Sequence, residues 1–552
     1  MTDPPGGRAA PPEFMEARAR AGHPDAVDRY RACIERHPGF LPAYVELAGL
    51  VARDEPTEAR RLLMTALRLA RNAPAARPTI ARMLAALLAS LSPEDSDPEL
   101  EAQLLACFEE PVLDPQPLAN VVAALLLREH PDADAEAAVR DPLWLAFLAR
   151  CRNTLRAMEP RIATLRRHVL THEDPALDPL VAALALQGFA TGYVLAVSAE
   201  EKAALRTTSS TLRRAMAAPL IDLDAPPSVT SPLVAALVKR TLTDLADERD
   251  RAAAMPSLGG TVRPASRQVR AQYESHPYPR WHAPPPPRLA DVRAHLEGLP
   301  RIDHTALPPV PLATLVAGCG TGYEAIDLAR TDPSLVITAI DLSCASLAFA
   351  QRNAVELGLG AIAFVQGDLL DLGTERFDFI TATGVLHHLA DPLEGLRVLA
   401  GVLAPGGVLR IALYSRRARA LVRAAHALIA ARDWQGDDGI RALRAHILSL
   451  PPETPLARLA ESDDFWSLSG CRDLLFHVLE HQFDLPEIGR MIDAAGLTLA
   501  GVDAAADAQR LFRDRFGEAS PLDLAKWDAL EADHPTIFAG MIHFWCQKPL
   551  KP

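Results

Sequence analysis

The stretch that decides the fold is LVAGCGTGYEAI, residues 315–326. An apolar run, residues 315–317, leads into Gly318, Gly320 and Gly322, and a helical pattern follows. Glycine adopts left-handed backbone conformations without steric cost, and it lets a ligand approach bare backbone N–H groups. The pattern therefore predicts a buried strand, a tight ligand-binding turn and a helix whose N-terminus favours an anionic group.

Strands and helices alternate around this turn. The predicted strands are residues 312–317, 335–340, 361–366, 377–383 and 407–414, and the predicted helices between them are residues 323–329, 343–357 and 392–402. Such alternation predicts a doubly wound sheet of parallel strands. Two further strands are predicted at 497–502 and 541–547, after a mostly helical stretch, residues 416–496, that we interpret as an insertion.

An acidic residue ends the second predicted strand. Asp341 follows Gly320 by 21 residues, and a carboxylate placed there can accept hydrogen bonds from both hydroxyls of a ribose. A tight turn with a helix-capping aspartate would give a similar pattern without a ligand, but the joint spacing favours a nucleotide. A dinucleotide site needs G-x-G-x-x-G, whereas Gly322 comes one place early and Tyr323 follows it. Asp368, after the third strand, is placed to accept a hydrogen bond from the exocyclic amine of an adenine.

Together these motifs resemble one family. VAGCGTG, the Asp341 strand end, GDLLDL, FDFITATGVLHHLADP and LAPGGVLRIALYS follow one another in the order typical of class I S-adenosylmethionine-dependent methyltransferases, over residues 310–415. The resemblance implies an α/β fold, with a Rossmann-like doubly wound sheet whose last strand is antiparallel. It implies S-adenosyl-L-methionine as cofactor and methyl transfer by in-line displacement. The cofactor-binding residues that it implies are Ala317, Gly318, Gly320, Gly322, Asp341, Leu342, Asp368, Leu369, Thr383 and Gly384.

The roles of other residues near the methyl group are less specific. His387 and His388 are the candidate general bases, although packing or a hydrogen bond to the loop would also explain them. The candidate substrate-binding residues are Tyr278, Arg280, Trp281, Tyr414, Arg472, Asp473 and His477. We expect Asp473, His477 and Glu480 to share one helix face, where they would bind a metal or a substrate or form a salt-bridged surface. The resemblance implies that the insertion at 416–496, which contains them, covers the acceptor site, and this favours a role at the substrate.

Long helical regions precede this part of the chain. Residues 1–13 are predicted to be a disordered tail, 14–80 tetratricopeptide-like helical repeats, 81–250 a helical domain and 251–307 a proline-rich linker, before a methyltransferase domain formed by 308–415 and 497–552. An ordinary helical hairpin would also explain the repeat. The motifs QYESHPYPRW, FWSLSGCRDLLFHVLEHQF and FAGMIHFWCQKP resemble a bacterial subgroup that carries such repeats.

The uncharged stretch 179–199 is predicted to be a buried core helix rather than a membrane span.

The amino-acid composition limits the kinds of partner that we expect for this protein. With 57 basic and 70 acidic residues the formal net charge is −13, which disfavours a general nucleic-acid binder. The seven cysteines are scattered and never spaced as C-x-x-C, so we expect a reducing, cytoplasmic location and no metal site. The N-terminus lacks the pattern of a secretory signal, and we expect no membrane partner. The helical platform favours a peptide or protein side chain as methyl acceptor, and a small molecule or a sugar stays open, as does a non-catalytic scaffold that binds the cofactor.

Overall fold

The computed structural model describes residues 10–20, 23, 25–91, 99–111, 113–260, 263–281, 283–284 and 291–550. Its contacts divide the chain into two compact units, Met1–Val238 and Lys239–Pro552, which are described separately below. Most of the predicted N-terminal tail lies outside the described residues.

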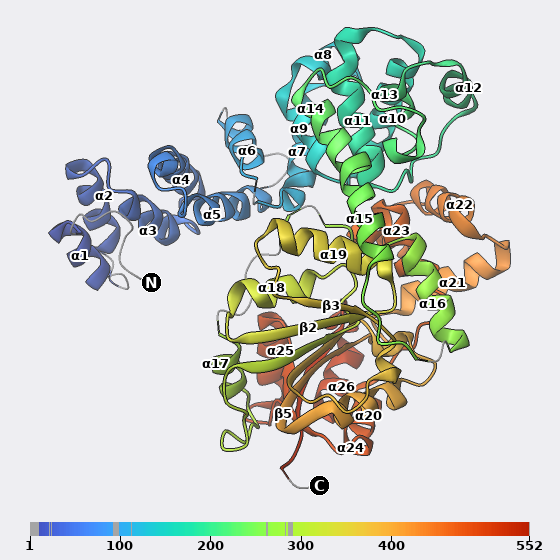
Figure 1. Ribbon diagram of the computed structural model, residues 1–552. Coiled ribbons are helices and arrows are strands. Elements are labelled where there is room, and N and C mark those ends of the chain that lie inside the picture. Colours follow the sequence, from blue (N-terminus) through green and yellow to red (C-terminus); the bar gives the residue numbers. More distant parts are fainter. Residues whose placement is uncertain are drawn as a thin grey trace. The chain divides into compact units, whose positions relative to one another are not determined.

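The first unit contains only helices among its described residues (Figure 1). They are α1 (Pro12–Ala19), α2 (Ala26–Arg36), α3 (Leu41–Val51), α4 (Pro56–Leu69), α5 (Arg77–Ala89), α6 (Leu100–Phe108), α7 (Ala119–Glu129), α8 (Ala135–Arg140), α9 (Pro142–Arg150), α10 (Glu159–Thr171), α11 (Asp178–Ala190), α12 (Ala199–Thr207), α13 (Thr211–Arg214) and α14 (Pro232–Val238). Tyr30 on α2 and Leu63 on α4 are buried, as a packed helical hairpin requires, and the tetratricopeptide assignment stays a prediction.

The uncharged stretch of residues 179–199 lies in this unit, and its first part, up to Ala190, forms a helix. Residues 180–187 of α11 are all buried. The helix ends at Ala190, and Gly192 and Tyr193 then adopt positive φ angles of 64° and 58°. None of the described helices is long and apolar enough to cross a membrane.

A seven-stranded sheet forms the centre of the second unit, in the order β3-β2-β1-β4-β5-β7-β6. The strands are β1 (Leu312–Ala317), β2 (Leu335–Asp341), β3 (Ala363–Gln366), β4 (Phe377–Thr383), β5 (Leu403–Leu413), β6 (Thr498–Asp503) and β7 (Ile542–Gln547). The first five pair in parallel, and β7 runs antiparallel to both β5 and β6. The predicted fold class, including the antiparallel last strand, is confirmed.

Helices cover both faces of this sheet. The helices of the second unit are α15 (Asp244–Ala253), α16 (Pro264–Ser275), α17 (Val292–Glu297), α18 (Tyr323–Thr331), α19 (Cys344–Glu356), α20 (Pro392–Val402), α21 (Ala420–Arg432), α22 (Gly436–Ser449), α23 (Leu468–Leu475), α24 (Leu485–Ala494), α25 (Ala506–Phe516) and α26 (Leu524–Asp533). One apolar core joins α17, α18 and α19 to the sheet, and another joins α20, α24, α25 and α26 to its other face. The parallel strands therefore carry apolar side chains on both faces, as buried parallel strands must.

The segment predicted as a linker has structure of its own. It contains α16 and α17, and its residues 256–258 extend the sheet at β3. The backbone N–H of Leu258 donates to the carbonyl of Gln366 at 2.8 Å, and the N–H of Gln366 donates to the carbonyl of Pro256 at 2.7 Å. These bonds hold the start of α16 beside the carboxyl end of β3.

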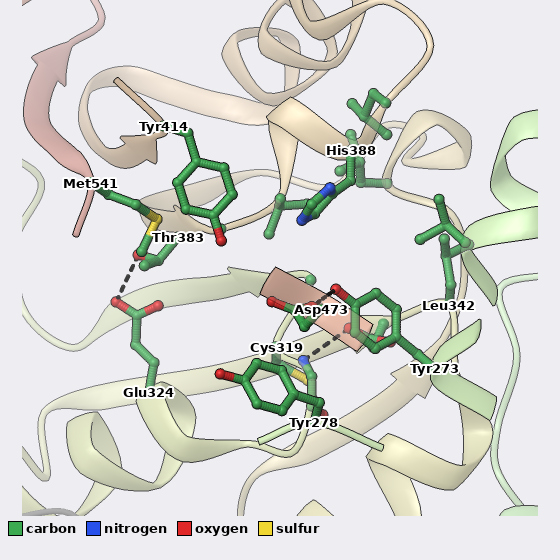
Figure 2. Close-up of a pocket in the computed structure, with 18 of the residues that line it drawn as sticks. Tyr273, Tyr278, Cys319, Glu324, Leu342, Thr383, His388, Tyr414, Asp473 and Met541 are labelled. Atoms are coloured by element: carbon green, nitrogen blue, oxygen red, sulfur yellow. Dashed lines mark hydrogen bonds between the residues drawn. The ribbon is translucent and has the colours of Figure 1, made fainter. Parts of the chain in front are cut away.

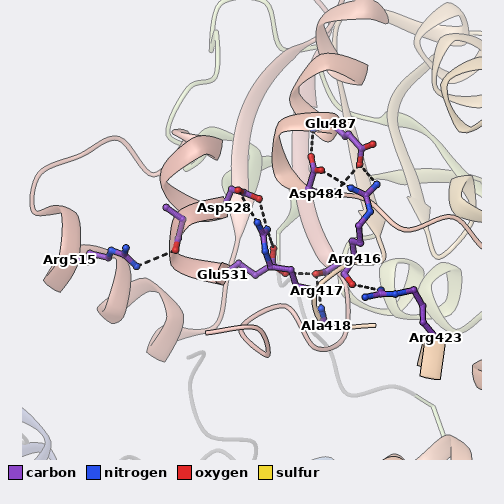
Figure 3. A network of polar contacts seen from close by, with 11 residues as sticks. Arg416, Arg417, Ala418, Arg423, Asp484, Glu487, Arg515, Asp528 and Glu531 are labelled. Atoms are coloured by element: carbon purple, nitrogen blue, oxygen red, sulfur yellow. Dashed lines mark hydrogen bonds and ion pairs between the residues drawn. The ribbon is translucent and has the colours of Figure 1, made fainter. Parts of the chain in front are cut away.

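The segment after β5 is fastened to later helices by ion pairs (Figure 3). Arg416 pairs with Asp484 at 2.7 Å and with Glu487 at 2.5 Å, at the start of α24. Arg417 pairs with Asp528 and with the buried Glu531 of α26. This arginine clasp, Arg416 and Arg417, fixes the chain where it leaves β5 and so fixes Tyr414 just before it.

Candidate functional site

A cavity of about 710 Å³ opens at the carboxyl ends of β1, β2, β4 and β5 (Figure 2). Its volume lies within the usual range for small-molecule sites. Twelve residues predicted from the sequence line it: Gly318, Gly320, Asp341, Leu342, Asp368, Leu369, Thr383, Gly384, His388, Tyr278, Tyr414 and Asp473.

The glycine turn forms one wall of the cavity. Gly318, Gly320 and Gly322 have φ angles of 65°, 52° and 80°, which L side chains rarely adopt. A Cβ atom on Gly318 would lie 2.5 Å from a methyl group of Val385, and one on Gly322 would lie 2.5 Å from Cβ of Ala350. Gly318 thus allows close contact across the cavity, and Gly322 allows α18 to pack on α19.

Asp341 connects the turn to the next strand. Its Oδ2 accepts a hydrogen bond from the backbone N–H of Gly320 at 2.8 Å, and its Oδ1 accepts one from the N–H of Ser343 at 2.9 Å. Burial raises the pKa of this carboxyl group, and the two N–H donors oppose the rise. The carboxylate is held rigidly at the place where the sequence predicts ribose binding.

Asp368 is more heavily engaged than the sequence suggests. Its Oδ1 accepts a hydrogen bond from the N–H of Leu370 at 3.0 Å. Its Oδ2 accepts one from the hydroxyl of Ser266 at 2.5 Å and one from Arg263 at 3.3 Å. Both partners belong to the segment at the start of α16, so this segment closes over the site and uses part of the capacity of the carboxylate.

Sequence reasoning missed a second carboxylate beside the turn. One oxygen of Glu324, in the first turn of α18, lies 3.1 Å from Arg410 of β5 and accepts a hydrogen bond from the hydroxyl of Thr383 at 3.4 Å (Figure 2). The other oxygen has no hydrogen bond within the described ranges. Its position two residues after Gly322 was the available signal, since a helix that starts at a ligand-binding turn points its first side chains toward the ligand.

A directed chain of hydrogen bonds leads to Tyr273 and Asp473 in another part of the cavity wall. The backbone N–H of Leu479 donates to Nδ1 of His477 at 3.1 Å, which leaves the proton of the neutral ring on Nε2. That nitrogen lies 3.2 Å from the hydroxyl oxygen of Tyr273, and the hydroxyl donates to Oδ1 of Asp473 at 2.6 Å. The chain therefore ends on a carboxylate oxygen, and Oδ1 accepts the only hydrogen bond to this group in the described part of the molecule.

The ionisation of these groups is strongly perturbed. Burial raises the pKa of Asp473 to about 7, and the nearby carboxylates of Asp464 and Glu480 add to this effect against the hydrogen bond from Tyr273. Burial lowers the pKa of His477 to about 4. Near neutral pH, His477 is uncharged and Asp473 is close to its midpoint.

The two candidate bases have different surroundings. His388 lines the cavity, its Nδ1–H donates to the carbonyl of Leu479 at 2.8 Å, and its ring stacks on His477 with centroids 3.7 Å apart. His387 is fully buried outside the cavity lining and stacks on Tyr414 with centroids 4.0 Å apart. Burial lowers the pKa of both rings well below the usual histidine value.

Tyr414 is held in place by two neighbouring side chains. The guanidinium of Arg419 lies 3.5 Å from the centroid of its ring, and the ring of His387 stacks on it. Arg419 in turn pairs with Glu480 at 2.7 Å, and their side chains are only 7% and 4% exposed. Tyr414, His388 and Asp473 point into the same space (Figure 2).

Seven predicted site residues do not line the cavity: Ala317, Gly322, His387, Arg280, Trp281, Arg472 and His477. Arg280 pairs with Glu248 at 2.6 Å, the indole N–H of Trp281 donates to the carbonyl of Thr321 at 3.1 Å, and Arg472 pairs with Asp437. The first two fasten their segment to the fold, while Tyr278 from the same motif reaches the cavity.

The expected helix face of Asp473, His477 and Glu480 is wrong. Helix α23 ends at Leu475, so only Asp473 of the three is helical. The tertiary contacts of His477 with His388 and Tyr273, and of Glu480 with Arg419, replace further helical turns. The three side chains still gather, but through the fold rather than through helical spacing.

Comparison with known proteins supports the resemblance to methyltransferases. Residues 312–439 match the model of a methyltransferase domain. An uncharacterized protein of Synechococcus sp. is 35% identical over 295 residues, which are 48% of this chain and 66% of that protein. The ubiquinone biosynthesis O-methyltransferase of Caulobacter vibrioides is 35% identical over 144 residues, which are 25% of this chain and 56% of that protein. The chain thus spans 66% and 56% of these relatives.

A solved structure is similar at a lower level. PKMT2 from Rickettsia typhi is 14% identical, with a TM-score of 0.36 over 46% of this chain and 51% of that chain. The sheet order, the glycine turn with Asp341 and the matched family model agree. Residues 312–439 therefore belong to the methyltransferase domain family, and the chain carries a class I S-adenosylmethionine-dependent methyltransferase domain.

Proposed function

We propose that the chain transfers a methyl group from S-adenosyl-L-methionine to an acceptor by in-line displacement. The observation that carries this proposal is the hydrogen bond from Gly320 to Asp341 inside a cavity of about 710 Å³. It joins the glycine turn to a carboxylate at the end of the next strand. The cofactor supplies an activated methyl group on a sulfonium, so the protein contributes alignment and exclusion of water.

Each part of the cofactor has a partner of suitable chemistry. We assign the ribose hydroxyls to Asp341 and the adenine to Asp368 and Leu369. The glycine turn accommodates the methionine part, and the free oxygen of Glu324 would hold its ammonium group. Arg410 and Thr383 fix the other oxygen of Glu324, which supports this assignment.

We propose a peptide or protein side chain as the acceptor. The cavity extends from the glycine turn to Tyr414, Tyr278 and Asp473, so one cavity has room for a cofactor and for the end of a side chain. A small molecule or a sugar would need the same room and is the alternative acceptor.

A general base is needed only if the acceptor carries a proton. Of the two histidines predicted for this role, His388 lines the cavity. Its Nδ1–H is used by the carbonyl of Leu479, so the neutral ring presents Nε2 as an acceptor. His387 is buried against Tyr414 and would act only by positioning that ring.

The first test is calorimetric titration with S-adenosylhomocysteine and, separately, with NAD. We expect micromolar binding of S-adenosylhomocysteine alone, and its loss in Asp341→Ala. Binding of NAD instead, or no binding of S-adenosylhomocysteine, would refute the proposed function.

A further inference from the structure

The part of the cavity beyond the glycine turn has an unusual lining. Three tyrosines and two carboxylates gather there: Tyr273, Tyr278, Tyr414, Asp464 and Asp473. They come from α16, the loop after it, the end of β5, the 3-10 helix η10 (Asp463–Trp466) and α23. We call these five residues the acceptor chamber.

The hydrogen bonds in the chamber leave acceptor capacity unused. The hydroxyl of Tyr273 donates to Oδ1 of Asp473, and the hydroxyl of Tyr278 donates to Oδ1 of Asp464. Both tyrosines thus spend their protons on carboxylates. Oδ2 of Asp473 accepts no hydrogen bond from any described residue, although the side chain is mostly buried. A buried carboxylate oxygen in this state favours a ligand that donates hydrogen bonds.

Asp473 forms no ion pair with any residue that the structure describes. Arg419 lies against Tyr414, but it is already paired with Glu480. The guanidinium of Arg419 is therefore not free to pair with Asp473. His388 and His477 are uncharged near neutral pH, because burial lowers their pKa values. Aromatic faces together with a carboxylate that lacks a counter-ion favour a cation.

We propose that the methyl acceptor is an amine, which binds as an ammonium ion with Asp473 as its hydrogen-bond and proton acceptor. This inference rests on the proposed function and names the acceptor class. An alcohol or a phenol would offer one proton to Oδ2 but would leave the negative charge of Asp473 without a counter-ion.

The reaction balances without a further reactant. The ammonium group gives one proton to Oδ2 of Asp473 and becomes a neutral amine. The nitrogen lone pair forms the new N–C bond as the S–C bond breaks, and that bonding pair stays on sulfur as a thioether. The product is an N-methylammonium ion, and Asp473 later returns its proton to water. The chain Leu479–His477–Tyr273 keeps Oδ1 as an acceptor, which directs the transferred proton to Oδ2.

The test uses matched amine and alcohol probes on the full chain saturated with S-adenosylhomocysteine. One pair is Nα-acetyl-lysine methylamide with its 6-hydroxynorleucine counterpart, and the other is phenethylamine with 2-phenylethanol. We expect each amine that binds to bind at least about ten-fold more tightly than its alcohol. Tighter binding of the lysine probe would identify a peptide source, and tighter binding of phenethylamine a small-molecule source. With radiolabelled S-adenosylmethionine, the preferred amine should accept the label on nitrogen.

Asp473→Asn is the matched variant, since it keeps the size and removes the charge. It should lose about ten-fold or more of its amine affinity, beyond any change in its affinity for S-adenosylhomocysteine. Tyr273→Phe, which frees Oδ1, is a second variant and should change the amine-to-alcohol ratio less. A chain that binds S-adenosylhomocysteine yet shows no preference for either amine overturns the amine assignment, and so does an unchanged ratio in Asp473→Asn. No binding of S-adenosylhomocysteine by the wild type refutes the proposed function instead.

Discussion

The hydroxyl of Tyr273 donates a hydrogen bond of 2.6 Å to Asp473, which follows it by 200 residues in the chain. One partner lies in a segment that looks like a linker and the other in what looks like an insertion. Their contact shows that this wall of the cavity is built from segments outside the sheet.

Glu324→Gln should weaken binding of S-adenosylhomocysteine by about ten-fold, because the amide cannot pair with the ammonium group. It should not weaken binding of 5′-methylthioadenosine, which lacks the amino-acid part. Asp341→Asn is the control and should weaken both ligands alike, because both carry the ribose. Calorimetry on the four combinations measures this, and equal losses for the two ligands in Glu324→Gln would disprove the ammonium assignment.

Gly318→Ala should greatly weaken cofactor binding and destabilise the domain by about 1–3 kcal/mol. A Cβ atom there meets Val385, and the φ angle of 65° is itself strained for alanine. Adding Val385→Ala removes the methyl groups at 2.5 and 2.8 Å and should restore part of the stability. Gly358→Ala is the control, since its φ is 74° with nothing within 4 Å, and it should affect stability alone. Melting temperatures measure the stability of the variants, and titrations with S-adenosylhomocysteine measure their cofactor binding. A Gly318→Ala variant with unchanged stability and binding would contradict the argument that Gly318 allows a close approach.

Asp473 should make the second unit less stable as pH rises from about 4 to about 7. Its folded-state pKa of about 7 lies above the ordinary value of 3.8, so the folded chain holds a proton that the unfolded chain releases. The expected slope is about 1.4 kcal/mol per pH unit, and it ends near pH 7. The groups near Asp473 are Tyr273, Tyr278, Tyr414, His477, Asp464, Glu480 and Arg419.

Those neighbours titrate as well, so comparison with Asp473→Asn isolates the effect. The lowered pKa of His477 acts in the opposite direction, because its stabilising neutral form is lost as pH falls. We expect Asp473→Asn to melt above the wild type at pH 8 and to lose this advantage at pH 5. A difference independent of pH would contradict the raised pKa.

Glu480→Gln should destabilise the second unit by about 3–5 kcal/mol, because it leaves Arg419 buried without a counter-ion. Glu487→Gln, which removes a half-exposed partner of Arg416 in the arginine clasp, should cost less than about 1 kcal/mol (Figure 3). Thermal melting of the two variants side by side tests the contrast. Equal effects would show that the Arg419–Glu480 pair gains little from its burial.

The sheet could be predicted because strands and helices are indicated by the spacing of apolar residues that are close together in the sequence. The bounds of β1 and β4 match the prediction, and the glycine turn could be read directly, since left-handed backbone needs glycine. The stop of α23 at Leu475 could not be read in this way. The residues after it are compatible with a helix, and only their contacts with His388 and Arg419 favour another path.

The sequence by itself determined the parallel sheet, the turn and Asp341, because each depends on the conformational preference and spacing of neighbouring residues. Only the tertiary structure decided the long-range contacts of the site. Arg263 and Ser266 donate hydrogen bonds to Asp368. Arg410 forms an ion pair with Glu324, and Tyr273 donates a hydrogen bond to Asp473. These contacts join residues of no fixed sequence separation. They form because burial of a charged or hydroxyl group requires a partner, whichever segment the fold brings within reach.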